Sequence, residues 1–580
     1  MSSSDITDTF DYIVVGGGTA GLVVASRLTE DPAVRLLVIE AGADHQNDPL
    51  VSTPGFLIGL LGNERYDWNY TSVPQAALDG RRASVARGKG LGGSSAINFM
   101  MTVFPSRASI DSWAKLGNQG WSYDELSPYF QRFGTRDSPT QEVREISRIK
   151  DFDDSLSGHG PVQMSFGQGH GALNSAWMDT HTALGFEAGK NDMMSGRVTG
   201  AFQNVSTIDP VTKARSYAAG AYYGPDVRQR SNLVVLTEAT VHKIELEGVD
   251  PEVVATGVQL RMKDGSMRSM KANREVILAA GAINSPQILE LSGIGRQELL
   301  EKHGIPVLVD LPEVGENLQD HVQEAVRQYQ ENGDGPLGSL AASASYLPMV
   351  DGDGSMSVDA RKMMLDECGD ESSGRTAVLK ELLTIPDEPA LSYVCFAAQM
   401  HTEGKEPSHF GTHMAPLRPE NYITILNALA HPFSRGSCHI RSPNVNDAPL
   451  IDPAYMSHPV DMEIAARSVM FVEKLVSTEP WSSAVLAPGG ARLPDIVPDH
   501  LEKAREVVRR RLVSNMHLSG TCAMLPRENG GVVSDRLLVH GTRNLRVIDA
   551  SIFPLIPLGN IQTTVYAVAE KAADLIKGVV

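Results

Sequence analysis

Length, composition and charge limit what this protein can be. The chain has 580 residues, of which 42% are hydrophobic and 21% charged, and its formal net charge is −19 at pH 7. Because this length exceeds what one hydrophobic core usually supports, we expect two or more domains. The negative charge argues against nucleic acid or an anionic membrane as a partner. No apolar run approaches the ~18 residues that a membrane-spanning helix needs.

The chain ends and the cysteines predict a reducing, cytoplasmic location. The N-terminus is polar and acidic, unlike a secretory signal, and the last residues do not form a peroxisomal tripeptide. Four scattered cysteines without a C-x-x-C pair predict neither a disulfide framework nor a zinc site. His409 and His413 have the i, i+4 spacing of metal ligands, but no Glu completes H-E-x-x-H, so we predict no metal.

The start of the chain has the pattern of a dinucleotide-binding unit. The apolar run 12–15 predicts a buried parallel strand, and a helix is expected over 19–28. Between them, Gly16, Gly18 and Gly21 have G-x-G-x-x-G spacing. Such glycines permit a tight turn, close approach of the backbone to a pyrophosphate, and close packing of the helix on the strand.

An acidic residue completes this unit. A second strand, 35–39, ends beside Glu40, where an acid is expected to meet a ribose hydroxyl. Strand, glycines, helix and acid together predict an adenine dinucleotide, although the motif does not say which one. The alternative is a glycine-rich turn without a function. A second glycine-rich run, 87–98, predicts a cradle for an anion or a cofactor ring, or otherwise a mobile surface loop.

The middle of the chain reads as a mixture of strands and helices. We expect a strand pair at 232–239 and 240–246, a hairpin of 253–261 with 267–271, and a separate strand over 275–280 that leads into Gly281. From 135 to 203 loops and short elements are expected. Further on, the patterns predict strands at 389–398, at 421–430 and from Ile440, and helices at 459–476 and 500–511. The acidic, weakly patterned stretch 333–386 is typical of a lid or loop. This pattern differs from that of the glycine-rich segments on either side and favours a second domain inserted into the first.

The end of the chain contains candidate catalytic residues. His517 precedes Gly520 and Thr521, and a strand over 545–548 leads to Asp549. Asn560 then precedes a helix that Gly578 is placed to cap.

Together the motifs resemble the glucose–methanol–choline (GMC) oxidoreductases, in particular their fungal FAD-dependent members. The resemblance covers nearly the whole chain and rests on four motifs in the order of the family. They are the G-x-G-x-x-G unit with Glu40, the run 88–98 with Pro105 and Asp111, the segment 281–295, and His517 with 549–551 and Asn560.

The resemblance implies an α/β (α+β overall) fold of two discontinuous domains. A Rossmann-like FAD-binding domain would comprise residues 1–165, 205–322 and 513–580. An inserted substrate-binding domain, built on an antiparallel sheet with helices, would comprise 166–204 and 323–512.

The resemblance also implies FAD as the cofactor. In some members a histidine just before the position of Asn98 bonds covalently to the flavin; Ile97 stands there, so we predict non-covalent FAD. The residues expected to contact FAD are Gly16, Gly18, Thr19, Ala20, Gly21, Glu40, Ala41, Trp68, Ser94, Asn98, Phe99, Met101, Val241, Ala550, Ile561 and Gln562.

Catalysis is expected at His517 and Asn560, by family position. Oxidising an alcohol requires removal of the hydroxyl proton while hydride leaves for flavin N5, and a neutral imidazole suits that task. Asn560 cannot take a proton and would orient the substrate oxygen, so His517 would be the base. Taken alone, the histidine could be structural, and the asparagine could cap the following helix.

Three functions are compatible with the sequence. The favoured one is oxidation of a primary, aryl or secondary-metabolite alcohol, with oxygen or another electron acceptor as partner. A flavin-containing lyase or cyclase of the same fold is the alternative, and a nicotinamide dehydrogenase is a third. Thr102, Ile561 and the pair Leu518–Ser519 depart from the usual family pattern and affect the expected shape of the pocket.

Overall fold

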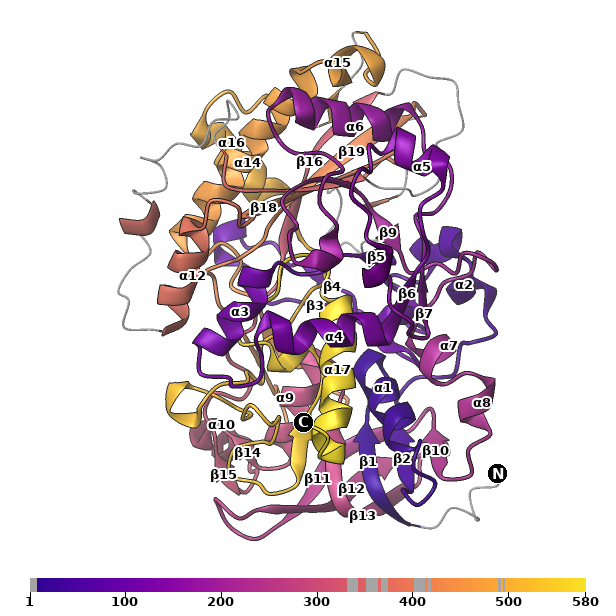
Figure 1. Ribbon diagram of the computed structural model, residues 1–580. Helices are drawn as coiled ribbons and strands as arrows, with labels where there is room; N and C mark the ends of the chain where they lie inside the picture. Colours follow the sequence, from indigo (N-terminus) through magenta and orange to yellow (C-terminus); the bar gives the residue numbers. More distant parts are fainter. Residues whose placement is uncertain are drawn as a thin grey trace.

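Two sheets of seven strands each organise the molecule. The computed structural model describes residues 8–330, 343–350, 364–366, 374–400, 413–414, 419–488, 492–493 and 496–580. In Figure 1 the first sheet lies in the lower half of the view, around β1, β2 and β13, and the second lies in the upper half, around β16, β18 and β19. None of the described helices combines the length and the apolar composition that crossing a bilayer requires.

The first sheet has a parallel core with an antiparallel edge. Its strand order is β10-β2-β1-β13-β12-β11, and β24 also pairs with β13. The parallel strands β1 and β2 are buried along most of their length because helices cover the sheet, including α1 and α17, which lie side by side in Figure 1. The strands are β1 (Thr9–Val15), β2 (Leu36–Ile39), β10 (Leu233–Leu236), β11 (Thr240–Glu247), β12 (Val254–Arg261), β13 (Met267–Leu278) and β24 (Leu545–Val547), and the helices are α1 (Thr19–Leu28) and α17 (Gln562–Lys577).

The predicted strand–turn–helix at the start of the chain is confirmed, and Gly21 shows why it needs glycine. A Cβ atom at Gly21 would lie 2.0 Å from the carbonyl oxygen of Gly16. No side chain fits there, so the helix can approach the turn after β1 only with glycine at this position.

Two strand predictions for this sheet were wrong, the first in its pairing and the second in its extent. β10 does not pair with β11; it pairs in parallel with β2, while β11 pairs antiparallel with β12. Glu238, in the left-handed backbone region with φ 56°, lies in the turn that redirects the chain between them. The strand expected over 275–280 is the end of β13, one strand that pairs with β12 and then runs parallel to β1 and β24. The hairpin of β12 with β13 is confirmed.

The second sheet is antiparallel and carries helices. Its order is β22-β16-β19-β18-β17-β8, and β23 also pairs with β16. α14 packs on β19, α6 on β8 and α16 on β16. The predicted strands near 389–398 and 421–430 and both predicted helices are present. The strands are β8 (Gly200–Gln203), β16 (Val322–Gln330), β17 (Ser343–Leu347), β18 (Leu391–Phe396), β19 (Tyr422–Leu429), β22 (Arg492–Leu493) and β23 (Leu512–Ser514); the helices are α6 (Ala172–Ala183), α14 (Pro459–Ser477) and α16 (Leu501–Arg511).

Three expectations differ from the structure in detail. The stretch 135–203 holds the 12-residue helix α6 as well as loops, because its apolar residues, Trp177 among them, pack into the core. β20 (Ser437–His439) ends one residue earlier, so no strand begins at Ile440. The described part of 333–386 includes the helix α12 (Gly374–Thr384). The five domain segments stay a prediction. Most strands of the two sheets divide along the chain as those segments do, but β16 begins at Val322 and β23 ends at Ser514, so these two second-sheet strands cross the predicted boundaries.

Smaller elements connect and cover the sheets. The remaining helices are α2 (Pro49–Ser52), α3 (Arg107–Lys115), α4 (Tyr123–Phe133), α5 (Gln141–Ile146), α7 (Ala218–Tyr222), α8 (Pro225–Arg228), α9 (Gly281–Leu291), α10 (Gln297–Lys302) and α15 (Trp481–Ala484). The short strands are β3 (Tyr70–Thr71), β4 (Ser84–Val85), β5 (Met101–Thr102), β6 (Gly134–Arg136), β7 (Val162–Met164), β9 (Val205–Ser206), β14 (Ile294–Gly295), β15 (Val309–Asp310), β20 (Ser437–His439) and β21 (Leu450–Asp452).

A bulge where the two sheets meet brings distant residues together. Val322 pairs with Ser514 in the β16–β23 ladder, and Gln319 forms a bridge with Ser519. Two residues therefore lie between the paired positions on one side (320–321) and four on the other (515–518). The two additional residues must bulge out of the ladder, as in a β-bulge. His517 lies in this bulge.

Candidate active site

Two hollows meet at His517 and Asn560. A cavity of about 490 Å³ lies against the first sheet and the N-termini of α1, α9 and α17. A smaller pocket of about 150 Å³ lies against β18 and β19 of the second sheet. The residues that line both hollows are Arg87, Ser94, Asn98, Phe99, Met101, Met516, His517 and Asn560.

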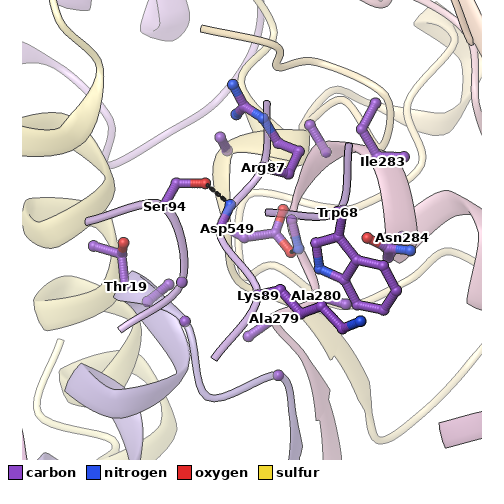
Figure 2. Close-up of a pocket in the computed structure, with 18 of the residues that line it drawn as sticks. Thr19, Trp68, Arg87, Lys89, Ser94, Ala279, Ala280, Ile283, Asn284 and Asp549 are labelled. Carbon is purple, nitrogen blue, oxygen red and sulfur yellow. Dashed lines mark hydrogen bonds between the residues drawn. The ribbon is translucent and has the colours of Figure 1, made fainter. Parts of the chain in front are cut away.

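The larger cavity gathers almost all of the predicted cofactor residues. All of them except Gly21 line it, as do His517 and Asn560. Gly21 lies beneath the turn instead, in the packing position described above. Figure 2 shows Thr19 and Ser94 on one side of the cavity and Trp68 and Asn284 on the other. The lining thus comes from segments at the beginning, the middle and the end of the chain.

The N-terminus of α1 fits an anionic dinucleotide. Gly18 is the N-cap of this helix, and glycine has no side chain that could cap the N–H groups of the first turn. A Cβ at Gly18 would make only ordinary van der Waals contacts, the nearest with the Cα of Gly93 at 3.8 Å, so packing within the protein does not itself require glycine here. Free N–H groups and the positive end of the helix dipole favour a phosphate at such a position.

Glu40 holds three backbone segments at the cavity wall. One carboxylate oxygen accepts a hydrogen bond from the N–H of Gly17 (2.9 Å), and the other accepts from Gly42 (2.8 Å) and Gly90 (3.1 Å). Burial raises the pKa of this carboxyl, and the three N–H groups oppose that shift. A carboxylate has about four lone-pair sites, so capacity remains for a ribose hydroxyl.

Several cavity residues were not predicted from the sequence. Arg87 and Lys89 line the cavity from the glycine-rich run 87–98, and the sequence predicted no individual role for either. Asp549, the residue before Ala550, accepts hydrogen bonds from the N–H of Gly281 (2.9 Å) and the hydroxyl of Ser285 (2.6 Å), and so ties α9 to the end of β24. Its position after a strand was the available signal.

The backbone around His517 is held from two sides. Met516 has a left-handed conformation with φ 60°, which is uncommon for a residue with a side chain. Its carbonyl accepts a hydrogen bond from the Arg87 guanidinium. The N–H of His517 donates to Asp320 (2.8 Å), whose carboxylate also accepts from Tyr455 (2.7 Å) and Ser514 (2.5 Å). These contacts fix the histidine in the bulge.

The His517 ring contacts one polar group at each nitrogen. Its Nε2 lies 3.2 Å from Nδ2 of Asn560, and its Nδ1 lies 2.9 Å from Nδ1 of His321. The sequence predicted no role for His321. The two histidines are 196 residues apart in the chain. Only their tertiary contact identifies His321 as part of the site.

Burial keeps this histidine pair neutral. The pKa of His517 is lowered well below its usual value, chiefly by burial and further by His321 and Arg87. Burial lowers the pKa of His321 to about 3, against the opposing effect of its contact with Ala430. Burial also raises the pKa of Asp320 to about 6. A neutral imidazole is the form that can accept a proton.

The smaller pocket is largely apolar. Its described lining residues include no carboxylate, and the only side chain among them that is always charged is Arg87. Its aromatic and aliphatic lining residues include Phe99, Tyr346, Val394, Phe396, Leu426 and Leu429. Such a lining suits a compact, uncharged ligand.

The structure gives no sign of a metal centre in its described part. No group of three or more His, Cys, Asp or Glu residues that could hold a metal ion occurs among the described residues. His409, one of the two histidines considered in the sequence, lies outside the described residues.

Comparisons with known proteins agree along the whole chain. Two family models, both described as GMC oxidoreductase, match residues 10–323 and 432–569. The chain is 34% identical over 619 residues to the dehydrogenase mpl7 of Monascus purpureus, covering 98% of this chain and 96% of the relative. A solved FAD-dependent oxidoreductase from Chaetomium thermophilum superimposes with a TM-score of 0.81 at 28% identity, over 98% of this chain and 99% of that one. A fungal aryl-alcohol oxidase gives a TM-score of 0.79 at 27% identity, over 99% of this chain and 100% of that one.

Proposed function

This chain belongs to the GMC oxidoreductase family, and from that premise we propose that it oxidises a compact, largely apolar alcohol to the carbonyl, with His517 as the base. It is an oxidoreductase whose cofactor is FAD. The family assignment replaces the nicotinamide alternative. The observation that carries the proposal is the place of His517 and Asn560, where the larger cavity meets the apolar pocket.

The larger cavity would hold the cofactor. Gly18 and Thr19 at the start of α1 would bind its diphosphate, and Glu40 would accept a hydrogen bond from the adenosine ribose. When bound, FAD supplies the acceptor for the hydride that leaves the alcohol carbon. Ile561 and Gln562 line the same cavity at the N-terminus of α17, whose dipole favours negative charge beside it, and Ala550 lines it from the turn after Asp549.

The proton goes to His517. The Nδ2 of Asn560 is a donor, and it faces the Nε2 of His517, so this nitrogen acts as an acceptor in the neutral ring. An alcohol oxygen placed beside both groups would accept a hydrogen bond from Asn560 and give its proton to Nε2 of His517. Asn560 orients the oxygen but takes no proton.

The cofactor would be bound without a covalent link. Ile97, at the position where some family members carry the linking histidine, has no group that could form a bond and is 4% exposed. Acid precipitation should therefore release all the flavin into the supernatant. Flavin that stayed with the polypeptide would contradict this part of the proposal.

Removing the base is the direct test. His517→Ala should lower the rate of flavin reduction by about a hundredfold or more while FAD still binds. His540→Gln is the matched control, because His540 contacts a backbone carbonyl, that of Leu525, and lines neither hollow. Normal turnover in His517→Ala would remove the proposed base.

An anaerobic experiment separates the remaining alternatives. Adding substrate without oxygen should bleach the flavin absorbance if the protein oxidises the alcohol. Product formed without bleaching would favour the lyase or cyclase alternative instead. Uncharged aryl and aliphatic alcohols should bleach the flavin faster than choline, which is charged, or glucose, which is polyhydroxylic, because the smaller pocket is largely apolar.

A further inference from the structure

His321 is a buried histidine with a partner at each ring nitrogen. It is 2% exposed and lies just before β16. Its Nε2 is 3.1 Å from the carbonyl oxygen of Ala430, and its Nδ1 is 2.9 Å from Nδ1 of His517. The two rings meet edge to face, with centroids 5.1 Å apart and planes at 85°.

The Ala430 carbonyl fixes where the proton of His321 lies. A carbonyl oxygen can only accept, so Nε2 of His321 must carry hydrogen. A neutral imidazole has a single N–H group, so its Nδ1 is an acceptor. The Ala430 peptide is itself anchored, because its N–H donates to the carbonyl of Ala390 at 2.9 Å. The Ala430 carbonyl, at which this series of hydrogen bonds begins, is therefore held in place by the backbone of the second sheet.

The proton on His321 also determines which nitrogen of His517 carries hydrogen. Since Nδ1 of His321 is an acceptor, the hydrogen between the two rings belongs to Nδ1 of His517. A neutral His517 then has its lone pair on Nε2, the nitrogen that faces Asn560 at the junction of the two hollows. The other tautomer would place two lone pairs against each other in a buried contact, which should lower its population by about tenfold or more.

We propose that His321 is a positioning residue that holds His517 in the tautomer with a free Nε2, using the Ala430 carbonyl as its fixed reference. The proposal rests on the function proposed above, in which Nε2 takes the proton of the alcohol. His321 does not line the flavin cavity; it lines the smaller pocket, and in this role it acts through His517. Once His517 is protonated, its Nδ1–H still donates to His321, so the contact supports both protonation states.

Other charged and titratable groups surround the pair and bear on the test. Arg87 and Asp320 hold the backbone of the bulge, and Tyr455 bonds to Asp320. His431, next to Ala430, contacts Glu388 at 2.8 Å and lowers the pKa of His321 further. None of these groups offers an acceptor to Nδ1 of His517 among the described contacts, so His321 alone sets the tautomer.

Two substitutions separate tautomer control from packing. His321→Gln keeps one acceptor and one donor, so it can accept from His517 and donate to Ala430. His321→Phe keeps a ring of similar size but offers no acceptor. We expect flavin reduction to slow by about 10- to 100-fold in His321→Phe with KM changed by less than about threefold, and to stay within about fivefold in His321→Gln. Equal defects in both variants, or a normal rate in His321→Phe, would overturn the proposal.

A spectroscopic measurement tests the tautomer without turnover. In protein labelled with ¹⁵N-histidine, the signals of His517 can be assigned by their absence in His517→Gln. We expect the pyrrole-type shift at Nδ1 and the pyridine-type shift at Nε2 in the native protein, with the difference reduced in His321→Phe. A protonated Nε2 in the native protein at neutral pH would refute the proposal, even if His321→Phe does not fold. Failure of the base assignment would show separately, as normal turnover in His517→Ala.

Discussion

Flavin reduction should keep its full rate well below the pH at which an ordinary histidine becomes protonated. Burial lowers the pKa of His517 well below its usual value, and Arg87 and His321 act in the same direction. A histidine with the ordinary pKa of ~6.5 is about 90% protonated at pH 5.5, so as a base it would lose about tenfold in rate between pH 7.5 and 5.5. A base that stays neutral should lose less than about twofold over the same interval.

The assay is anaerobic rapid mixing with saturating alcohol, following the loss of flavin absorbance between pH 5 and 8. Asp320 requires a control, because burial raises its pKa to about 6 and its carboxylate accepts the backbone N–H of His517. Asp320→Asn removes that titration. A break near pH 6 that disappears in Asp320→Asn belongs to the aspartate. A tenfold loss centred near pH 6.5 that persists in Asp320→Asn would show that His517 titrates as an ordinary histidine, and would refute the argument from burial.

Three further outcomes follow from the packing of the cofactor domain and of the histidine pair. Gly21→Ala should cost about 3 kcal/mol or more of unfolding free energy, because its Cβ would meet the Gly16 carbonyl at 2.0 Å. Gly59→Ala is the control, since a Cβ at Gly59 would meet no atom within 4 Å. Urea unfolding of both variants measures the difference, and equal stabilities would contradict the prediction. The pKa of His321 is lowered to about 3 in the folded protein, so the stability of the fold is unaffected by this residue above pH ~6.5 and falls at lower pH, by about 2 kcal/mol at pH 5. In urea unfolding, His321→Gln should therefore lose less stability between pH 7 and pH 5 than the native protein. An unchanged loss would contradict the effect of burial. The guanidinium of Arg215, which is 5% exposed, donates to the backbone and side-chain oxygens of Asn98 at 2.7 and 3.0 Å. Arg215→Gln should therefore raise the Kd for FAD about tenfold when apoprotein is titrated with FAD. An unchanged Kd would show that Arg215 does not support the position of Asn98 at the cofactor.

Local patterns determined the cofactor end of the molecule. The strand, the glycines 16, 18 and 21, and the helix after them interact within about thirty residues, so their spacing in the sequence carries the geometry. Gly21 must be glycine because of a contact only five residues away in the chain, with the carbonyl of Gly16. For the same reason the hairpin of β12 with β13 could be predicted from its turn.

Pairing between distant segments was beyond the sequence. β10 joins β2 across about two hundred residues, and a run of alternating apolar residues is compatible with either neighbour. Asp549 and Arg87 reach the cavity only because the end of β24 and the glycine-rich run meet there. Asp549 had one local signal, its position after a strand, whereas Arg87 had no local pattern that distinguishes a site residue from an ordinary polar one.

The histidine pair marks the boundary between the two kinds of information. The sequence by itself determined that His517 and Asn560 stand in a family pattern that suits proton removal, because a reactive side chain type and its spacing can be read along the chain. Only the tertiary structure decided which nitrogen of His517 is free. That choice depends on a hydrogen bond to His321 and, through it, on the Ala430 carbonyl, and these contacts exist because the bulge opposite β16 aligns segments 196 residues apart.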